Sequence, residues 1–385
     1  MKKIILIGSI SDFGGREVEV NTLIHILNKD YRVNLFSTIE MTKKTFALKE
    51  TKIDWSTLND QLLKINFFIR MLAWLTKKKS NSNLPLGCFI SNKLSNQLFD
   101  LNKLCLRVIK KEIDNVDLVL FCGVFTNGFF KEIVEYCSIQ NKIIIFRTTG
   151  TVSEIPESLK ETLRKISKII IHSENNSQIF KTNNLNNIKI IDQTTLLEKD
   201  LLRIKIGNTP ELIYGYLGRF SKEKGILELL ANFKESERQL HIAGSGPLVH
   251  EVKNLCENNV NFNFSGALLP SEIASFFSKI DVLIIPSHEE SGPLVGVEAM
   301  AAGKIILSTR VGAMMDRTNN TQNQFWFDIN DKQSLLTSLE AIETLIGERL
   351  ISIRKELRKK YIDNYSKSKV DSEYLRLIEN LQQTQ

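Results

Sequence analysis

Residues 1–36 read MKKIILIGSISDFGGREVEVNTLIHILNKDYRVNLF, and this stretch decides the fold class. The apolar run at residues 4–7 predicts a buried strand, and the loop Phe13-Gly14-Gly15 follows it. Residues 16–27 have helical periodicity, and residues 31–36 read as the next strand. A strand, a glycine loop, a helix and a second strand in this order are typical of a βαβ unit with a parallel sheet.

The same order of elements recurs along the chain. Short apolar runs extend the first sheet at residues 118–122, 143–146 and 169–171, and a second set follows at 213–217, 239–243, 260–264, 282–285 and 305–308. Runs this apolar are typical of parallel strands that are covered on both faces. The sequence therefore predicts an α/β protein with two Rossmann-like, doubly wound domains.

The length of 385 residues fits two domains. We place the first domain at residues 1–200 and the second at residues 201–364, with a candidate linker at 199–209. Residues 365–385 form a further helical segment after a break at Asn364-Tyr365-Ser366.

Charge and cysteine content exclude several classes of protein. The formal net charge of +7 attracts anions such as phosphorylated small molecules, nucleic acid or an anionic membrane. No motif that reads nucleic acid is visible, so we expect no nucleic-acid partner. The five cysteines form no CxxC pair, which argues against a zinc site and favours a reducing, cytoplasmic compartment. The N-terminal apolar run is too short for a signal peptide, and no stretch approaches the roughly 20 apolar residues of a membrane-spanning helix.

Polar loops follow the strands of the second domain, where ligands bind in sheets of this kind. The first loop holds Gly218, Arg219 and Lys224, whose two cations suit a diphosphate, although a solvated basic turn fits equally well. The second loop holds Gly244 and Gly246, which either let a ligand approach closely or form a simple tight turn.

The third loop is the most informative and reads PSHEESGPLVGVEAMAAG at residues 286–303. A proline suits the first turn of a helix, and Pro293 follows Ser291-Gly292 at such a point. The amides of Leu294 and Val295 would then point out of the helix N-terminus toward an anion.

Two carboxylates belong to this third loop and its helix. Glu290 and Glu298 can accept hydrogen bonds from sugar hydroxyls, or they can serve as a helix-dipole carboxylate and a salt-bridge partner. A fourth loop, Thr309 to Gly312 with Asp316, is compatible with the same crevice.

These segments together resemble the retaining glycosyltransferases of family 4, which have the GT-B fold of two Rossmann-like domains facing across a cleft. The resemblance rests on GRFSKEKG at 218–225, IAGSGP at 242–247, SGALLPSEIASFFSKIDVLIIPS at 265–287 and EESGPLVGVEAMAAGK at 289–304. It covers most of residues 213–312 and the N-terminal half only loosely.

The resemblance implies a role for each group of residues. Arg219 and Lys224 would hold the donor diphosphate, Glu290 would touch the transferred sugar, and Glu298 would hold the ribose hydroxyls. The donor would also contact loop residues of both domains, which are Gly14, Gly15, Gly218, Gly244, Gly246, Ser291, Gly292, Pro293, Leu294 and Val295. The helix at 365–385 would cross back to the first domain, although a free amphipathic helix is the alternative.

One departure from the family concerns a histidine near the reacting centre. Many members carry this residue after a central N-terminal strand, where the present chain reads Arg147-Thr148-Thr149-Gly150. Arg147 and Thr149 are candidates for contact with the acceptor or sugar, and a structural salt bridge is the alternative for Arg147. His172, after the next strand, is better explained as a core or capping histidine.

The implied activity is sugar transfer with retention from a nucleotide-sugar donor, UDP-linked, to a glycan or lipid-linked acceptor in surface polysaccharide assembly, such as capsule or O-antigen. No DxD-like motif follows a strand, so we expect no essential metal and no cofactor. An epimerase or phosphorylase acting on the same donor and a non-catalytic nucleotide-sugar-binding subunit remain as alternatives. A dehydrogenase is excluded because the segment from Gly8 to Gly14 lacks GxGxxG.

Residues 61–79 read QLLKINFFIRMLAWLTKKK and predict one helix with an apolar side and a basic end. Such a helix can lie in a membrane interface, or it can pack on a sheet with its lysines in solvent. The first alternative would add peripheral contact with the anionic inner face of the cell membrane to the cytoplasmic location.

Overall fold

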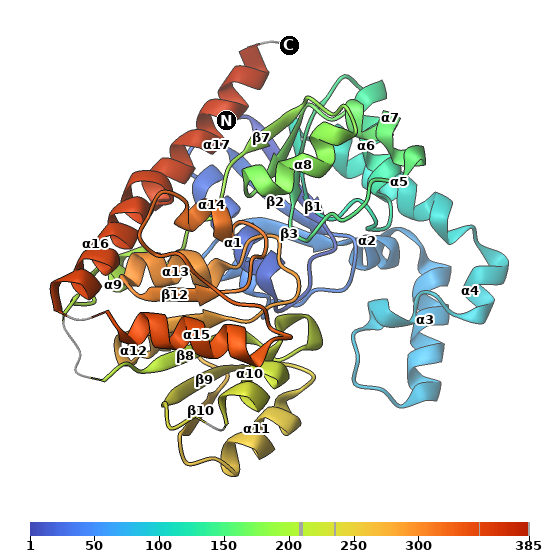
Figure 1. Cartoon of the computed structure of the whole chain (residues 1–385). Coiled ribbons are helices and arrows are strands. Elements are labelled where there is room, and N and C mark those ends of the chain that lie inside the picture. Colours follow the sequence, from blue (N-terminus) through green and yellow to red (C-terminus); the bar gives the residue numbers. More distant parts are fainter. Residues whose placement is uncertain (208–210, 235, 346, 384–385) are drawn as a thin grey trace. The chain divides into compact units, whose positions relative to one another are not determined.

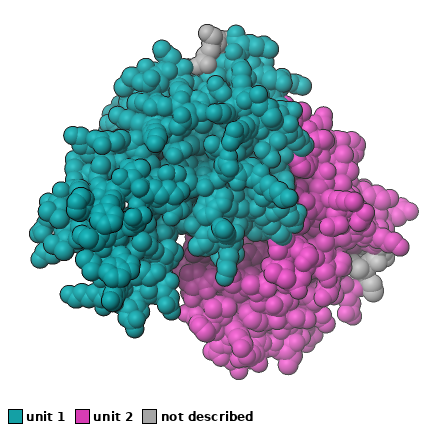
Figure 2. Space-filling model, turned by 180° about the vertical axis from the view of Figure 1, so that it is seen from behind, with its two compact units in different colours: residues 1–171, 177–190, 374–385 teal, residues 172–176, 191–373 magenta. Residues whose placement is uncertain are grey.

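The computed structural model describes residues 1–207, 211–234, 236–345 and 347–383. The chain forms two compact units, which Figure 2 shows in different colours. Unit 1 comprises residues 1–171, 177–190 and 374–385, and unit 2 comprises residues 172–176 and 191–373. Each unit holds one parallel sheet with helices packed on it (Figure 1).

The sheet of unit 1 has seven strands among the described residues, in the order β3-β2-β1-β4-β5-β6-β7. These strands are β1 (Lys3–Gly8), β2 (Arg32–Ser37), β3 (Asp54–Thr57), β4 (Leu118–Gly123), β5 (Ile143–Thr148), β6 (Lys168–Ile171) and β7 (Ile188–Ile190). Every neighbouring pair is parallel, and all residues of β4 and β5 are buried. The strand order reverses between β1 and β4, so a crevice is expected at the carboxyl ends of these two strands.

Helices connect the strands of this first sheet. They are α1 (Gly15–Leu27), α2 (Leu58–Ile65), α3 (Phe67–Ser80), α4 (Lys93–Leu98), α5 (Leu101–Asp114), α6 (Phe130–Ile139), α7 (Glu157–Arg164) and α8 (Glu174–Thr182), with short 3₁₀ turns η1 (Phe46–Leu48) and η2 (Leu86–Phe89). Unit 1 also includes residues 374–385 at the end of the chain, where the Lys2 ammonium donates to the Gln382 side-chain oxygen at 3.1 Å.

The sheet of unit 2 has six strands in the described part of the chain, in the order β10-β9-β8-β11-β12-β13. They are β8 (Tyr214–Arg219), β9 (Leu240–Ser245), β10 (Phe262–Gly266), β11 (Val282–Ile285), β12 (Ile305–Ser308) and β13 (Phe325–Trp326). All neighbouring pairs are again parallel. Here the order reverses between β8 and β11, which carry the first and third of the predicted loops.

The remaining helices follow along the chain. They are α9 (Glu198–Leu202), η3 (Lys222–Lys224), α10 (Ile226–Phe233), α11 (Val249–Glu257), α12 (Pro270–Lys279), α13 (Leu294–Ala302), α14 (Met314–Thr318), α15 (Lys332–Glu343), α16 (Gly347–Asn364) and α17 (Lys367–Gln383). Small residues let α13 lie close to its neighbours, because a Cβ on Gly296 would fall 2.5 Å from the Met314 sulfur. This packing accounts for a glycine inside a helix, where it costs about 1 kcal/mol relative to alanine.

The two sheets confirm the predicted fold class. The sequence patterns did not predict β3, β7 and β13, which are edge strands of two to four residues without long apolar runs. The break in the C-terminal helical tail falls at residues 365–366, as predicted. The first residues of the predicted linker, 199–202, are helical, and Thr209 lies outside the described residues.

The single helix predicted at residues 61–79 is wrong. Asn66 has extended backbone angles, with φ −130° and ψ 103°, so α2 ends before it and α3 begins after it. The Asn66 side chain accepts a hydrogen bond from the Ile69 amide at 3.1 Å and thereby caps α3.

Candidate active site

The loops after β8 and β9 meet through backbone contacts in unit 2. The Phe220 amide donates to the Ser245 carbonyl at 2.8 Å. Gly244 has φ 145°, and a Cβ there would fall 1.8 Å from the Gly218 carbonyl oxygen. A Cβ on Gly246, at φ 154°, would fall 2.5 Å from the Phe220 oxygen. These glycines are therefore required by the close approach of two strand ends, whatever else they contact.

The loop after β8 also lies against the loop after β11. The His288 amide donates to the Glu223 carbonyl at 2.9 Å. Gly225 has φ 63°, and a Cβ there would fall 2.0 Å from the Pro286 oxygen. Backbone packing thus joins the two loops on either side of the point where the strand order reverses.

Lys224 and Glu290 come together at this junction. The Lys224 ammonium donates to the Glu290 carboxylate, and the two side chains are 25% and 13% exposed. The Ser287 hydroxyl donates to the same carboxylate oxygen at 3.2 Å. The sequence pointed to both residues but not to this ion pair, in which the carboxylate balances the lysine charge.

Arg219 differs from Lys224 in its surroundings. It is the last residue of β8, and it is exposed. The hydrogen bond that the Ser221 hydroxyl donates to Glu223 is the main cause that lowers the pKa of this carboxyl, and the charges of Lys224 and Arg219 lower it further. The edge of the sheet therefore presents one cation open to solvent and one held by a carboxylate.

The N-terminus of α13 follows Glu290 directly. Pro293 is the N-cap residue, with φ −64° and ψ 113°, so the helix begins at Leu294, one residue later than predicted. The amides of Leu294 and Val295 donate to no acceptor in the described part of the chain. First-turn amides of this kind are available to an anion.

Glu298 lies in the second turn of the same helix and is buried, with 4% of its surface exposed. Its carboxyl accepts a hydrogen bond from the Thr195 hydroxyl at 3.2 Å. Burial raises the pKa of Glu298 to about 7, and the hydrogen bond from Thr195 opposes this rise. A buried carboxyl with a raised pKa is characteristic of binding and catalytic sites.

The fourth loop supports the third. Gly312 has φ 48°, and a Cβ there would fall 2.3 Å from the Ser291 carbonyl oxygen. The Thr309 hydroxyl donates to the Ser287 carbonyl at 2.6 Å. The Asp316 carboxylate accepts a hydrogen bond from the Asn175 backbone amide at 3.2 Å and thereby holds the backbone at the start of α8.

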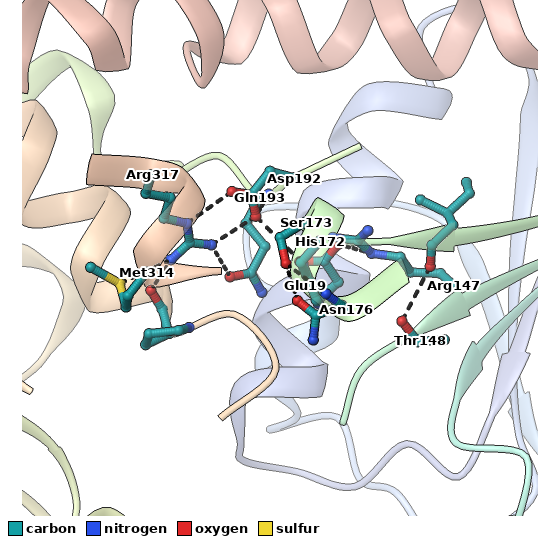
Figure 3. A network of polar contacts seen from close by, with 12 residues as sticks. Glu19, Arg147, Thr148, His172, Ser173, Asn176, Asp192, Gln193, Met314 and Arg317 are labelled. Carbon is teal, nitrogen blue, oxygen red and sulfur yellow. Dashed lines mark hydrogen bonds and ion pairs between the residues drawn. The ribbon is translucent and has the colours of Figure 1, made fainter. Parts of the chain in front are cut away.

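Arg317 is a functional candidate that the sequence reading missed. It is fully buried, and it donates to both carboxylate oxygens of Asp192 at 2.7 and 2.8 Å and to the Pro293 carbonyl (Figure 3). Burial opposes ionisation of Asp192, but the Arg317 charge and hydrogen bonds from Arg317 and His172 hold its pKa below the usual range. The guanidinium thereby fixes the residue that caps α13, and nothing in the sequence around Arg317 signals this contact.

His172 belongs to the same cluster. It is buried, and its Nδ1 lies 3.6 Å from the Asp192 carboxylate. A Cβ on Gly292 would fall 2.9 Å from the imidazole, so the glycine before Pro293 makes room for this ring. This position agrees with the interpretation of His172 as a core histidine.

The candidates of unit 1 lie at the carboxyl ends of its own strands. Gly14 is the N-cap of α1, with φ 153°, and Gly15 is exposed at the helix start. Arg16, which the sequence reading passed over, donates to the Thr149 hydroxyl at 3.0 Å and to the Ser9 carbonyl. Thr149 is thus positioned by a cation in the first turn of α1.

Arg147 is a structural residue in this conformation. Its side chain is completely buried, and its Nε donates to Glu19 of α1 at 2.7 Å (Figure 3). The structure therefore shows the stated alternative for Arg147, a salt bridge, and contact with the acceptor or sugar stays a prediction. The reason for the salt bridge is that the residue lies inside β5, where its side chain points into the unit.

Among the described residues, no cluster of three or more His, Cys, Asp or Glu side chains is placed to hold a metal ion. All five cysteines are free. In the same described ranges, no helix is both long and apolar enough to cross a bilayer.

Comparison with known proteins finds a family model that matches most of unit 2. Residues 198–367 match the sequence model of the glycosyl transferases group 1. The chain is 28% identical over 154 residues to an uncharacterized glycosyltransferase of Methanocaldococcus jannaschii, which covers 38% of this chain and 43% of that protein. It is 33% identical over 131 residues to a GDP-mannose-dependent alpha-mannosyltransferase of Corynebacterium glutamicum, which covers 34% and 31%. The chain thus matches less than half the length of these two relatives.

Other similarities extend further along the chain. The capsular polysaccharide biosynthesis glycosyltransferase CapM of Staphylococcus aureus is 27% identical over 268 residues, covering 65% of this chain and 66% of that protein. A glycosyltransferase structure from Rickettsia africae superposes with a TM-score of 0.71 at 18% identity, covering all of both chains. HepE of Anabaena in complex with UDP gives 0.66 at 17% identity, covering 99% of this chain and all of that chain.

The chain therefore has the GT-B fold, and its residues 198–367 match the sequence model of the group 1 glycosyl transferases. The loops that pack together after β8, β9, β11 and β12 all lie within that matched range.

Proposed function

We propose that this protein is a retaining glycosyltransferase that moves a sugar from a nucleotide-sugar donor, held by unit 2, to a glycan or lipid-linked acceptor. The observation that carries the proposal is the junction of Lys224, Glu290 and the α13 N-terminus where the strand order reverses. Ligands of doubly wound sheets bind at such a point.

The chemistry of this edge fits a diphosphate flanked by hydroxyl groups. Arg219, Lys224 and the free first-turn amides of α13 offer positive charge and hydrogen-bond donors to the diphosphate. Glu290 exchanges its contact with Lys224 for a hydroxyl of the transferred sugar when the diphosphate arrives. Glu298 accepts hydrogen bonds from the ribose hydroxyls, which compensate its burial.

In the reaction, the bond between the anomeric carbon and the diphosphate oxygen breaks, and the acceptor oxygen forms the new bond. The acceptor proton leaves with the nucleoside diphosphate. Charge develops on the departing oxygen, and donors that are already in place stabilise it without reorganisation. Retention of configuration rests on the resemblance to family 4.

The donor and the biological role rest on the relatives. The HepE structures hold UDP and UDP-glucose, and CapM acts in capsular polysaccharide biosynthesis, so we propose a UDP-linked donor and a role in surface polysaccharide assembly. The mannosyltransferase relative is GDP-mannose-dependent, which makes GDP-mannose the first competing donor to test. We further propose a cytoplasmic enzyme that needs no metal, so that EDTA leaves turnover unchanged.

The experiment uses the full chain and a panel of nucleotide-sugars in a thermal-shift assay. A true donor raises the unfolding midpoint progressively with its concentration, because it binds only the folded state. The stabilising donor is then incubated with acceptor glycans, and transferred sugar is detected by mass spectrometry. Nucleotide release without transfer would support hydrolysis or epimerisation, and stabilisation without any turnover would support the non-catalytic subunit.

A further inference from the structure

Helix α3 of unit 1 has two apolar faces, of which only one is packed. Ile69, Leu72 and Ala73 are buried beneath the helix. The opposite face carries large side chains that are 40–62% exposed, and we call it the α3 surface; its members are Phe67, Phe68, Met71, Trp74 and Leu75. Their spacing of three and four residues places all five along one side of the helix.

Neighbouring segments add further exposed apolar side chains. Ile65 ends α2, Leu84 precedes η2, and Leu94 and Leu98 belong to α4, and these four are 51–66% exposed. Helix α3 contacts α2, η2 and α4, which lie beside it in Figure 1. Large apolar side chains that gather in one region, rather than occurring singly, indicate an interaction surface.

The segment of chain that carries these apolar side chains has only basic charged residues. Between Asp60 and Asp100 the chain has no acidic residue, and its six basic residues are Lys64, Arg70, Lys77, Lys78, Lys79 and Lys93. These 39 residues therefore carry a formal charge of +6, whereas the whole chain carries +7. Nearly all of the excess charge of the protein is concentrated beside the exposed apolar side chains.

Cations and aromatic rings are interleaved within the α3 surface. The Arg70 guanidinium lies 5.6 Å from the centre of the Phe67 ring, and the Lys78 ammonium lies 5.3 Å from the Trp74 ring. In each pair the cation lies over an exposed aromatic ring of the same helix. A flat surface that is apolar inside and anionic at its boundary satisfies both kinds of group at once.

A second copy of the chain is a poor partner for this surface. A symmetric contact would place the same patch of each copy face to face, and therefore two segments of charge +6. An anionic bilayer instead offers phosphate groups to the lysines and an interface that aromatic side chains favour.

We propose that the α3 surface docks unit 1 onto an anionic membrane. Phe67, Phe68 and Trp74 enter the boundary between headgroups and acyl chains, and Lys77 to Lys79 contact lipid phosphates. The proposal does not depend on the proposed sugar transfer, although docking would bring unit 1 to a lipid-linked acceptor.

The test is flotation of the full-length protein with phosphatidylcholine vesicles, with and without about 30% phosphatidylglycerol. We expect at least about tenfold more protein on the anionic vesicles at low salt, and a loss of this binding at high salt. Emission of Trp74 should shift to the blue on binding, measured in a Trp55→Phe/Trp326→Phe background.

Two variants separate the apolar and charged contributions. Phe67→Ser/Trp74→Ser should lower vesicle binding at least about tenfold, whereas Ile139→Ser, at a 72% exposed residue of α6 in the same unit, should bind as the wild type. Lys77→Gln/Lys78→Gln/Lys79→Gln should lower binding to a similar extent. Its matched control is the exposed triple Lys234→Gln/Lys253→Gln/Lys279→Gln, which should change binding little. Circular dichroism melts verify that each variant is folded.

Three results would overturn the proposal. They are equal binding to neutral and anionic vesicles, undiminished binding by folded Phe67→Ser/Trp74→Ser, and a dimer in sedimentation that this variant dissociates. Lys224→Ala should bind vesicles as the wild type does, so a failure of the proposed sugar transfer leaves the membrane result interpretable.

Discussion

The two sheets have the same order in their first six strands, but the cations at their carboxyl ends have opposite surroundings. In unit 2, Arg219 is exposed and Lys224 is a quarter exposed beside Glu290. In unit 1, Arg147 is fully buried against Glu19. Both sheets reverse their strand order at the first strand, and both have a glycine-containing loop after it.

The difference comes from where along the strand each cation lies. Arg219 is the last residue of β8, so its side chain is free of the sheet. Arg147 precedes the last residue of β5 and all of that strand is buried, so its charge needs a buried partner. A cation near a strand end is therefore open to solvent only when its position in the pleat leads outward.

The largest effect should come from removing the buried charge of unit 1. Arg147→Met leaves Glu19 buried without its ion pair, and breaking such a pair costs about 3–5 kcal/mol of unfolding free energy. Urea denaturation measures this change. Arg219→Met, at an exposed position, should stay within about 0.5 kcal/mol of the wild type. Similar losses in the two variants would contradict the contrast between the units.

Lys224→Ala should produce the next largest effect, on turnover. Removing one preformed donor to a developing negative charge typically lowers kcat by about 10²–10³-fold. The matched control is Lys222→Ala, an exposed lysine of the same 3₁₀ turn, which should keep wild-type kcat. Steady-state kinetics with the identified donor measure kcat for both variants. Equal kcat values would remove Lys224 from the mechanism.

Glu298 links stability to pH in a definite direction. Burial raises its pKa from 4.5 to about 7, so the folded protein holds this proton more tightly than the unfolded chain does. The contribution of Glu298 to stability is therefore most favourable below pH 4.5 and declines as the pH rises to about 7. Above that value, the ionised carboxyl costs about 3 kcal/mol.

Glu298→Gln should consequently stabilise the unliganded protein at about pH 8, by up to about 3 kcal/mol, while weakening donor binding. Donor affinity of the wild type should fall as the pH drops from about 8 to 6, because a protonated carboxyl accepts ribose hydrogen bonds poorly. Thermal melts and calorimetric titrations across this pH range test both statements. A variant that retains the wild-type pH dependence of affinity would exclude Glu298 as its source.

The smallest effect concerns free nucleoside diphosphate. Glu290→Gln removes the anion that competes for Lys224, so affinity for UDP or GDP should rise by up to about tenfold, whereas turnover of the nucleotide-sugar should fall. Glu289→Gln, at the exposed neighbouring position, serves as the control and should change neither quantity. Unchanged diphosphate affinity in Glu290→Gln would mean that the ion pair does not regulate the site.

Sequence patterns predicted the sheets because buried parallel strands leave long apolar runs, as in β4 and β5. They missed β3 and β13, whose few residues carry no such run. Gly244 and Gly246 were singled out for close ligand approach or a tight turn, whereas the structure shows that the neighbouring backbone requires Gly244, since a Cβ there would overlap the Gly218 carbonyl oxygen. Local patterns could not show that Lys224 pairs with Glu290, 66 residues away.

Sequence patterns could not predict the contacts among Arg317, Asp192 and His172 for the same reason. Its members come from separate segments of the chain and meet only in the folded unit, and an arginine on a short helix such as α14 ordinarily reads as a solvated residue. Asn66 shows why the helix at residues 61–79 was predicted wrongly. Its side chain caps α3 and separates two helices, although the amphipathic pattern of the sequence continues across it.

The most direct measurement is a crystal structure of the protein with an uncleaved nucleotide-sugar. The account predicts diphosphate oxygens within hydrogen-bonding distance of Arg219, Lys224 and the first amides of α13, with Glu298 at the ribose and Glu290 released toward the sugar. A donor bound away from the junction of β8 and β11, with the Lys224–Glu290 pair intact, would contradict it.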